Sequence, residues 1–465
     1  MDMPIFKKLW EEKYQIVPDQ LKKIKKVKAI ATGFNANIDA IYKLNVQRLS
    51  DLIKKTKLSL ADLNNVERCR ILDKQDFVKG IFKTFTQGIA EEWICEDEKV
   101  YQWMLKEVGY DYLQIGGQGG IMANVLSTVG VKKVFAHANS LPKLQAEQFA
   151  QNDNLLSFDE NGDIKPAYRI DRKKDLPLIH WIVEFKKGDI IELEGQSFRC
   201  PKSNRFIATY DPLNLKLVLD QNFVTHIKQE KLDFAVLSGF HALLSNSGGE
   251  ALIEEAADKI KAWKEASPQT IFHLEIASTQ DMVIRKAIVQ KLIPIVDSIG
   301  INDRETMDLL EVLDQKALAK RCRQQTTAEN LLKGLSVIKE KTGIKRAQLH
   351  MFGLYLTLQD KGFKITTNDN FKGMLTASVV AASKAKTGSV DDENIKSIKY
   401  DVSDVGLIEL DSLSVALGQP DLALKGLGRY RFWDLIAAPT ILIEKPISLV
   451  GMGDTISSIS LIAAR

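Results

Sequence analysis

The sequence predicts an α/β protein whose larger domain contains a doubly wound, mostly parallel sheet flanked by helices, with a small α+β domain beside it. Two observations predict this fold. From Leu232 onward, short apolar runs alternate with stretches of helical length and period, as in parallel sheets covered on both faces. Before Leu232 two segments break this alternation, and 465 residues exceed the usual size of one compact domain.

Composition and charge argue against several classes of protein. The net charge of +4 is small for this length, so a nucleic-acid partner is not indicated. The four cysteines are scattered without a CxxC pair, which argues against a zinc site and a disulfide framework. No apolar run reaches the roughly 18 residues of a membrane span, and the charged N-terminal residues do not resemble a signal peptide. We therefore expect a cytoplasmic protein without a membrane partner.

The N-terminal part predicts a helix at residues 4–14 and a short strand at residues 29–34. Three polar side chains follow at the carboxyl end of this strand: Asn35, Asn37 and Asp39. Asn offers hydrogen-bond donors and an acceptor, and Asp can accept from two hydroxyl groups, so these residues suit a polyol substrate. Asn and Asp are also favoured in turns, and the sequence leaves both interpretations open.

Two segments are assigned to the smaller domain. Residues 43–112 mix helix and loop, are rich in charge and lack a clear strand–helix alternation. Residues 164–210 have the pattern of antiparallel strands, with Lys187-Gly188-Asp189 as the turn of a hairpin. The prediction is a larger domain of residues 1–42, 113–163 and 211–465 and a smaller, discontinuous domain of residues 43–112 and 164–210.

A glycine-rich loop, Gly116-Gly117-Gln118-Gly119-Gly120, leads into a predicted helix. It does not match the GxGxxG fingerprint, so a dinucleotide site is only weakly indicated. Because glycine lets the backbone approach a ligand closely, the loop fits a small polar ligand better.

The C-terminal half supplies the alternating elements. The expected strands are residues 234–237, 270–276, 295–301 and 347–352, and a last buried strand from the apolar run at residues 441–443 and 449–450. The expected helices are residues 249–266, 280–292, 304–313, 328–342 and 371–385. Ligands of such sheets bind beyond the carboxyl ends of the strands.

The motif Gly451-Met452-Gly453-Asp454 lies between that last strand and a final helix. A glycine turn at a helix N-terminus forms an anion site, because the first N–H groups lack partners within the helix and the helix dipole favours negative charge. Asp454 would repel a bound phosphate, which makes sense if it takes a proton from a hydroxyl group that attacks phosphorus. The alternative is a helix cap, since Asp is a common N-cap residue.

Two further carboxylates fall at strand ends. Glu275 shares a strand face with His273, and Glu305 follows Asn302 by three residues. Two carboxylates near a phosphate site suit Mg²⁺, which takes one or two of them together with water and phosphate oxygens. The alternatives are a buried histidine–carboxylate pair and a helix capping box. The P-loop motif and the protein-kinase motifs are absent from the sequence.

Together these motifs resemble the ADP-dependent sugar kinases of archaea, namely ADP-dependent glucokinase and ADP-dependent phosphofructokinase of the ribokinase-like superfamily. Five motifs occur in the family's order and span nearly the whole chain: Gly33-Phe34-Asn35-Ala36-Asn37-Ile38-Asp39, Gly116-Gly117-Gln118, His273-x-Glu275, Asn302-x-x-Glu305 and Gly451-x-Gly453-Asp454. Gly119 departs from the alanine-like residue expected there. The resemblance implies a ribokinase-like large domain and a lid domain that closes over the sugar, and we expect a monomer.

The resemblance also implies roles for individual residues. Asp454 would be the general base, and the backbone of Gly451, Met452 and Gly453 would bind the transferring β-phosphoryl group of ADP. Glu275 and Glu305 would hold Mg²⁺, partly through water. The other implied residues are Asn35, Asn37, Asp39, Gly117, Gln118 and His180 for the sugar, Arg205 as the lid arginine that reaches a phosphate, and Asn302 and His350 for the nucleotide.

Two lid residues bear on the identity of the sugar. Fructose 6-phosphate differs from glucose by a phosphate dianion, which needs fixed cations. In the resembled family a lysine just before the strand of His180 accompanies phosphofructokinase activity, and Lys174 is the candidate here. A carboxylate in the first lid segment accompanies glucose use, and Glu91 is the candidate.

The resemblance therefore implies an ADP-dependent phosphofructokinase of a modified glycolysis, which forms fructose 1,6-bisphosphate and AMP, or an enzyme that uses both sugars. ADP-dependent glucokinase is the first alternative. The others are an ATP-dependent kinase of the same superfamily and a non-catalytic protein of this fold that binds a sugar or a nucleotide.

Overall fold

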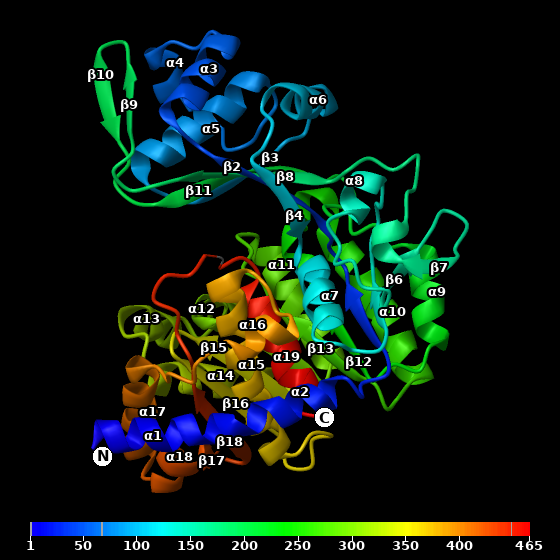
Figure 1. Ribbon diagram of the computed structural model, residues 1–465, viewed down its shortest axis with the longest axis vertical. Coiled ribbons are helices and arrows are strands. Elements are labelled where there is room, and N and C mark those ends of the chain that lie inside the picture. The colour runs from blue at the N-terminus through cyan, green and yellow to red at the C-terminus, as the bar shows by residue number, and fades with distance from the viewer. Residues whose placement is uncertain (1, 67, 448) are drawn as a thin grey trace.

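An eleven-stranded sheet forms the centre of the larger part of the molecule in the computed structural model, which describes residues 2–66, 68–447 and 449–465 (Figure 1). Its strands are, in spatial order, β17 Leu427–Tyr430, β18 Trp433–Pro439, β16 Leu354–Gln359, β15 Arg346–Met351, β14 Ser298–Ile301, β13 Ile271–Glu275, β12 Phe234–Leu237, β1 Ile30–Gly33, β5 Val134–Ala136, β6 Leu155–Phe158 and β7 Ile164–Pro166. The seven strands from β15 to β6 are parallel, and the strands at both edges are antiparallel.

The central strands are buried on both faces, because helices cover the sheet from both sides. Helices α2, α7, α15 and α19 pack against one another, and α9 to α12 with α14 form a second packed series. The helices are α1 Met3–Lys13, α2 Val17–Ile24, α7 Gln118–Thr128, α8 Lys143–Ala146, α9 Gln221–Gln229, α10 Gly249–Ala266, α11 Met282–Ala287, α12 Asp303–Val312, α13 Lys316–Gln324, α14 Ala328–Thr342, α15 Thr367–Thr387, α16 Asp392–Lys396, α17 Asp404–Leu417, α18 Pro420–Lys425 and α19 Met452–Ile462. Among the described residues, no helix is both long and apolar enough to span a bilayer.

The predicted last strand is wrong. The apolar run before Gly451 is an irregular segment, in which Ile447 and Leu449 are 69% and 63% exposed, while Ser448 lies outside the described residues. Pro446 cannot donate to a strand ladder, and the charged pair Glu444-Lys445 interrupts the apolar pattern. The sheet continues beyond β15 through β16, β18 and the edge strand β17, three antiparallel strands that were not expected from the sequence.

A second, five-stranded sheet lies above the large sheet in Figure 1. Its strands are, in order, β3 Glu91–Ile94, β11 Asn204–Tyr210, β8 Ile179–Phe185, β2 Asn37–Lys43 and β4 Tyr112–Gly116. Helices α3 Val46–Thr56, α4 Leu60–Asn64, α5 Lys74–Gln87 and α6 Glu98–Glu107 cover one face. The sheet and these helices share an apolar core around Trp93, Trp181 and Phe206, separate from the core of the larger part.

The two predicted boundaries at 42/43 and 112/113 fall at β2 and β4, and both strands belong to the smaller sheet. Asn37 and Asp39 therefore lie on that sheet, although the sequence grouped them with the larger domain. Strand β1 ends at Gly33 and β2 begins at Asn37, with three residues between them, so the chain passes from one sheet to the other within the predicted polar motif.

The predicted hairpin is formed at a different turn. The Lys187-Gly188-Asp189 turn exists, but β8 on its N-terminal side pairs with β11. Strand β9 Ile190–Leu193 pairs instead with β10 Gln196–Arg199. Glu194 and Gly195, with φ of 49° and 75°, connect them, and positive φ at both central residues gives the twist that a two-residue hairpin requires.

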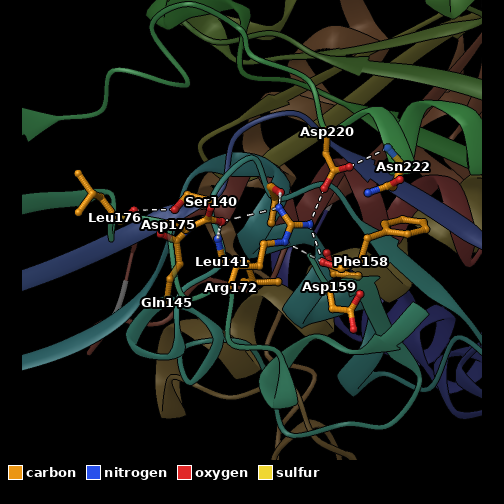
Figure 2. Close-up of polar contacts among 12 residues, drawn as sticks. Ser140, Leu141, Gln145, Phe158, Asp159, Arg172, Asp175, Leu176, Asp220 and Asn222 are labelled. Atoms are coloured by element: carbon orange, nitrogen blue, oxygen red, sulfur yellow. Dashed lines mark hydrogen bonds and ion pairs between the residues drawn. The ribbon is translucent and has the colours of Figure 1, made fainter. Parts of the chain in front are cut away.

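A buried arginine fixes the loop that runs from the large sheet into β8 (Figure 2). Arg172 donates to the carbonyl oxygens of Phe158 and Ala138 and pairs with Asp220, which caps α9. Asp175 accepts a hydrogen bond from the Leu141 N–H at 2.8 Å. These contacts anchor residues 172–175 to the larger part of the molecule just before the chain enters the smaller sheet.

Arg172→Met should destabilise the protein by about 3–5 kcal/mol, because it leaves Asp220 and two buried carbonyl groups without their partner. Arg169→Met is the matched control, since the pair of Arg169 and Asp153 is 58% and 72% exposed and is expected to contribute at most about 1 kcal/mol. Urea unfolding of both variants measures the difference. Equal losses would show that the Arg172 contacts carry no special stability.

Candidate active site

Helix α19 starts at Met452 with the glycine turn predicted from the sequence. Gly451 is the N-cap residue and has a φ of 65°, in the left-handed region that favours glycine. The first bond within the helix runs from the Thr455 N–H to the Gly451 carbonyl at 3.0 Å. The N–H groups of the preceding residues have no acceptor within the helix, so this turn can bind an anion.

Asp454 lies in this first turn, and its side chain is buried. Gln118 Nε2 donates to Asp454 Oδ1 at 2.9 Å. Burial raises the pKa of Asp454, while the Gln118 hydrogen bond and the Lys384 charge oppose the rise. The N-cap position is occupied by Gly451, three residues earlier, so Asp454 is not the N-cap residue that the alternative required.

Glu275 ends β13 directly beneath this turn. A Cβ atom at Gly300 would lie 2.0 Å from Glu275 Oε2, and one at Gly453 would lie 3.3 Å from Oε1, so two glycines make room for the carboxylate. His273 Nε2 lies 3.5 Å from Oε2, and His350 Nε2 lies 3.7 Å from Oε1. Burial, and then the charges of Asp454 and Glu305, raise the pKa of Glu275 well above its usual range.

Glu305 forms a helix capping box with Asn302, the arrangement that the sequence offered as the alternative to a metal ligand. The Asn302 N–H donates to Glu305 Oε2, and the Glu305 N–H donates to Asn302 Oδ1, both at 2.9 Å. The box uses one carboxylate oxygen and leaves the other free. Burial raises the pKa of Glu305 to about 8, the Asn302 hydrogen bond opposes this, and the charge of Asp454 adds to it.

Three buried carboxylates lie near one another here, and the charge of Asp454 adds to burial in raising the pKa of both Glu275 and Glu305. Glu275 Oε2 is buried without a hydrogen-bond partner among the described residues, which leaves it available to a metal ion. Among those residues no group of three His, Cys, Asp or Glu side chains is arranged to hold a metal alone. The geometry therefore fits Mg²⁺ held by Glu275 and Glu305 with water and phosphate oxygens as further ligands.

The predicted sugar residues connect to Asp454 through a continuous series of contacts. Asn37 Nδ2 donates to Asp39 Oδ1 at 2.9 Å, and Asn35 Oδ1 accepts from the Gly119 N–H at 3.2 Å. A Cβ atom at Gly117 would lie 2.7 Å from Asn37 Oδ1, and the next residue, Gln118, contacts Asp454. Asn35, at the end of β1, also accepts from Ser238 beyond β12, where the strand order of the large sheet reverses.

The departure at Gly119 has a local cause. A Cβ atom there would lie 2.7 Å from the carbonyl oxygen of Asn35, closer than side chains pack. Glycine lets the start of α7 approach the end of β1 in this chain.

The smaller sheet presents a polar face to the same region. His180 on β8 lies opposite Asp39 on β2, and His180 Nε2 is 3.1 Å from Asp211 Oδ2. Burial lowers the pKa of His180, but the Asp211 hydrogen bond and the charges of Asp211, Glu92 and Asp39 outweigh it, and the net shift is upward. Burial raises the pKa of Asp39, and the positive charge of the exposed Arg205 on β11 is among the effects that oppose this rise.

Glu91 does not belong to this polar face. Its carboxylate accepts from Lys83 at 2.7 Å and from Trp93 Nε1 at 2.8 Å, on the face covered by α5. Side chains alternate along a strand, so the next residue, Glu92, points the other way. Glu92 Oε1 accepts from Thr209 Oγ1 at 2.6 Å, and its charge acts on Asp39 and His180. The sequence singled out Glu91 and missed Glu92, the neighbour that faces the site.

The structure places the other predicted residues as follows. Lys174 lies in an exposed turn five residues before Ile179, the first residue of β8. His350 lies under the start of α19, where a Cβ atom at Gly453 would be 3.0 Å from Nε2. This position suits the phosphate end of a nucleotide.

One residue near the site has no sequence signal. Lys384 belongs to α15, and its Nζ donates to the Gly451 carbonyl oxygen at 3.3 Å and to Thr455 Oγ1 at 3.1 Å. It lies in a largely buried helix without a motif, and only the packing of α15 on α19 brings it to the glycine turn.

Known proteins resemble this chain over nearly its whole length. The model of the ADP-specific phosphofructokinase/glucokinase conserved region matches residues 28–463. The chain belongs to the ADP-specific phosphofructokinase/glucokinase family. It is 28% identical to the ADP-specific phosphofructokinase of Methanosarcina acetivorans over 450 residues, 93% of this chain and 92% of that protein. It is 30% identical to the ADP-dependent glucose/glucosamine kinase of Pyrococcus abyssi over 457 residues, 97% of each chain.

Solved structures of this kind share the fold. A reconstructed last common ancestor of ADP-dependent phosphofructokinases from Methanosarcinales has a TM-score of 0.86 at 28% identity and covers 100% of this chain and 99% of its own. An ADP-dependent kinase in complex with fructose 6-phosphate and ADPβS has a TM-score of 0.82 at 28% identity, covering 98% and 97%. The predicted family and fold class are confirmed.

Asp454→Asn should lower kcat at least about 100-fold while ADP binding holds or strengthens, because a positioned base contributes about 10²–10⁴-fold and the variant removes a charge that repels phosphate. Steady-state kinetics and titration calorimetry with ADP and Mg²⁺ measure the two effects. Asp404→Asn, which changes the first-turn Asp of α17, is the matched control. A variant of Asp454 that keeps more than about a tenth of the wild-type kcat would contradict the base assignment.

The metal-free protein should become less stable as the pH rises from about 4.5 to about 8. The native state raises the pKa of Glu305 from 4.5 to about 8, so it binds a proton that the unfolded chain has already released, and that stabilisation is lost on deprotonation. Mg²⁺ should reverse the trend, since it stabilises the ionised carboxylates. Melting temperatures measured between pH 5 and 8.5 test both expectations, once with a chelator and once with Mg²⁺. Glu305→Gln should make the melting temperature depend less on pH under both conditions. An unchanged pH profile in Glu305→Gln would exclude Glu305 as the source.

Proposed function

We propose that this protein is an ADP-dependent phosphofructokinase, which transfers the β-phosphoryl group of ADP to fructose 6-phosphate and yields fructose 1,6-bisphosphate and AMP. The observation that carries the proposal is the series of contacts from Asp39 through Asn37 and Gly117 to Gln118 and Asp454. It joins a hydroxyl-binding cluster to a buried carboxylate at an anion-binding helix N-terminus. A protein that only binds sugar or nucleotide gains nothing from a carboxylate facing the phosphate.

In this mechanism Asn37, Asp39 and His180 bind sugar hydroxyl groups and orient the sugar. Asp454 Oδ2 accepts the proton of the attacking hydroxyl, while the Gln118 hydrogen bond fixes the position of Oδ1. The N–H groups of the first turn of α19 bind the oxygens of the transferring phosphoryl group. Glu275 and Glu305 would hold Mg²⁺, which neutralises phosphate charge when bound.

Sugar selection is assigned to the lid. The relatives include both phosphofructokinases and glucose/glucosamine kinases, so family membership leaves the acceptor open. We propose that the exposed Lys174 binds the 6-phosphate of fructose 6-phosphate. We also propose that Glu92, in place of Glu91, accepts a hydrogen bond from a hydroxyl group of glucose. Having both residues, the enzyme uses both sugars, and ADP-dependent glucokinase is the alternative if glucose is strongly preferred.

The two separate apolar cores favour a lid, formed by residues 43–112 and 164–210, that closes over the sugar. Strands β2 and β4 belong to this lid as well, because they are part of its sheet. The cytoplasmic location and the monomeric state stay predictions.

A coupled assay with ADP and each sugar, and with ATP in place of ADP, tests the proposal. ADP with fructose 6-phosphate should give turnover, and Lys174→Ala should raise KM for this sugar about 10–100-fold, the value of a charge-assisted phosphate contact, without changing glucose kinetics. Glu92→Gln should impair glucose use selectively. The neighbours Lys173→Ala and Glu91→Gln are controls, because Lys173 pairs with Asp171 and Glu91 with Lys83.

Turnover with neither sugar in the presence of ADP would reject the proposed function. If Lys174→Ala raises KM equally for both sugars, Lys174 supports the structure of the lid and does not bind the phosphate.

A further inference from the structure

The carbonyl oxygen of Gly451 is contacted by three donors. They are the Thr455 N–H at 3.0 Å, Thr455 Oγ1 at 2.8 Å and Lys384 Nζ at 3.3 Å. Lys384 Nζ also donates to Thr455 Oγ1 at 3.1 Å, so its ammonium group lies beside the glycine turn, between the Gly451 carbonyl oxygen and Thr455. The ordinary helix bond explains only the first donor.

The carbonyl of Gly451 and the N–H of Met452 belong to one planar peptide group and point in opposite directions. Whatever fixes the carbonyl therefore fixes the direction of the N–H. The Met452 N–H is one of the first-turn donors that have no acceptor within α19. Thr455 bonds to this carbonyl from within α19, and Lys384 adds a second restraint from α15.

The charge of Lys384 is not neutralised by an ion pair. Among the described residues no carboxylate oxygen lies within 4.0 Å of Nζ. Burial lowers the pKa of Lys384 to about 8, and the charge of Asp454 opposes this. A cation without a partner, beside a helix N-terminus, is complementary to an anion that arrives there.

We propose that Lys384 is a positioning residue of phosphoryl transfer, whose ammonium group holds the Gly451 carbonyl and so aims the Met452 N–H at the transferring phosphoryl group. The proposal rests on the proposed function and adds a residue to its machinery. The competing explanation is that Lys384 only ties α15 to α19, two helices that already pack closely through Gly373, where a Cβ atom would lie 2.1 Å from the Ser460 carbonyl oxygen.

A neighbouring cavity makes the proposal testable by chemical rescue. The cavity has a volume of about 360 Å³ and is lined by Lys384 together with Ile121, Asn124, Val125, Ser389 and Val450, among others. Lys384→Ala removes three carbons and the ammonium group, which are the heavy atoms of propylammonium. The cavity gives an ion of this size a route to the vacated position.

The experiment compares Lys384→Ala, Lys384→Met and Lys384→Arg with the wild type, and uses Lys386→Ala, an exposed lysine of the same helix, as the control. Both Ala and Met variants should lower kcat about 10–100-fold, somewhat less than the loss of an oxyanion donor itself, with the sugar KM changed less than about 3-fold. Calorimetry should show weaker ADP binding by a similar factor. Lys384→Arg and Lys386→Ala should stay within about 3-fold of the wild type.

Propylammonium should restore kcat and ADP affinity of Lys384→Ala at least about 5-fold, whereas 1-propanol, a neutral molecule of the same size, should not. Rescue by both compounds equally, or wild-type kcat and ADP affinity in Lys384→Met, would overturn the proposal and leave a packing role. Loss of melting temperature with unchanged ADP affinity in Lys384→Met would do the same. Because ADP affinity is measured without turnover, these outcomes remain decisive even if the wild type phosphorylates neither sugar.

Discussion

The first turn of α19 must keep its N–H groups directed away from the helix, and the arrangement of the site depends on this constraint. Gly451 adopts the left-handed conformation that begins the turn, and a Cβ atom there would lie 2.5 Å from Ile121 of α7. Helix α15 packs closely on the C-terminal end of α19 at Gly373 and reaches the turn itself through Lys384. The turn is thus held between α7 and α15, and both neighbouring helices supply polar contacts to it, Gln118 from α7 and Lys384 from α15.

Beneath the turn, negative charge is concentrated where water is largely excluded. Burial and the charge of Asp454 raise the pKa of both Glu275 and Glu305, so keeping these carboxylates ionised is costly unless a cation is present. The large sheet supplies one compensating charge from below, because Arg346 is fully buried and its charge interacts with Glu275. Arg346 donates to Ser298 at 2.9 Å, and Ser298 Oγ lies 2.9 Å from His273 Nδ1, so a polar network connects the arginine to the neighbour of Glu275.

The sugar side of the site is built differently, from strand ends and a sheet face. The chain leaves β1 of the large sheet at Gly33 and enters β2 of the smaller sheet at Asn37. The polar motif is therefore fixed to both sheets at once, and the loop held by Arg172 forms a second connection at the start of β8. Movement of the smaller sheet would act directly on Asn37, Asp39 and His180, while Asp454 stays with the larger part.

The sequence alone determined the alternation of strands and helices, the bounds of regular helices such as α10 and α14, and the motifs around Asp39, Glu275 and Asp454. These features follow from periodic burial and from local backbone chemistry, which short windows of sequence record. The tertiary structure decided strand pairing at both sheets, the irregular path of the apolar run before Gly451, and the choice between Glu91 and Glu92. A shift of one residue in strand register moves every side chain of the strand to the opposite face of the sheet. Because residues 91 and 92 are both glutamate, the sequence does not indicate which of them faces the site. Lys384 depended on tertiary structure most of all, because its position follows from the packing of two helices and not from any property of its own segment.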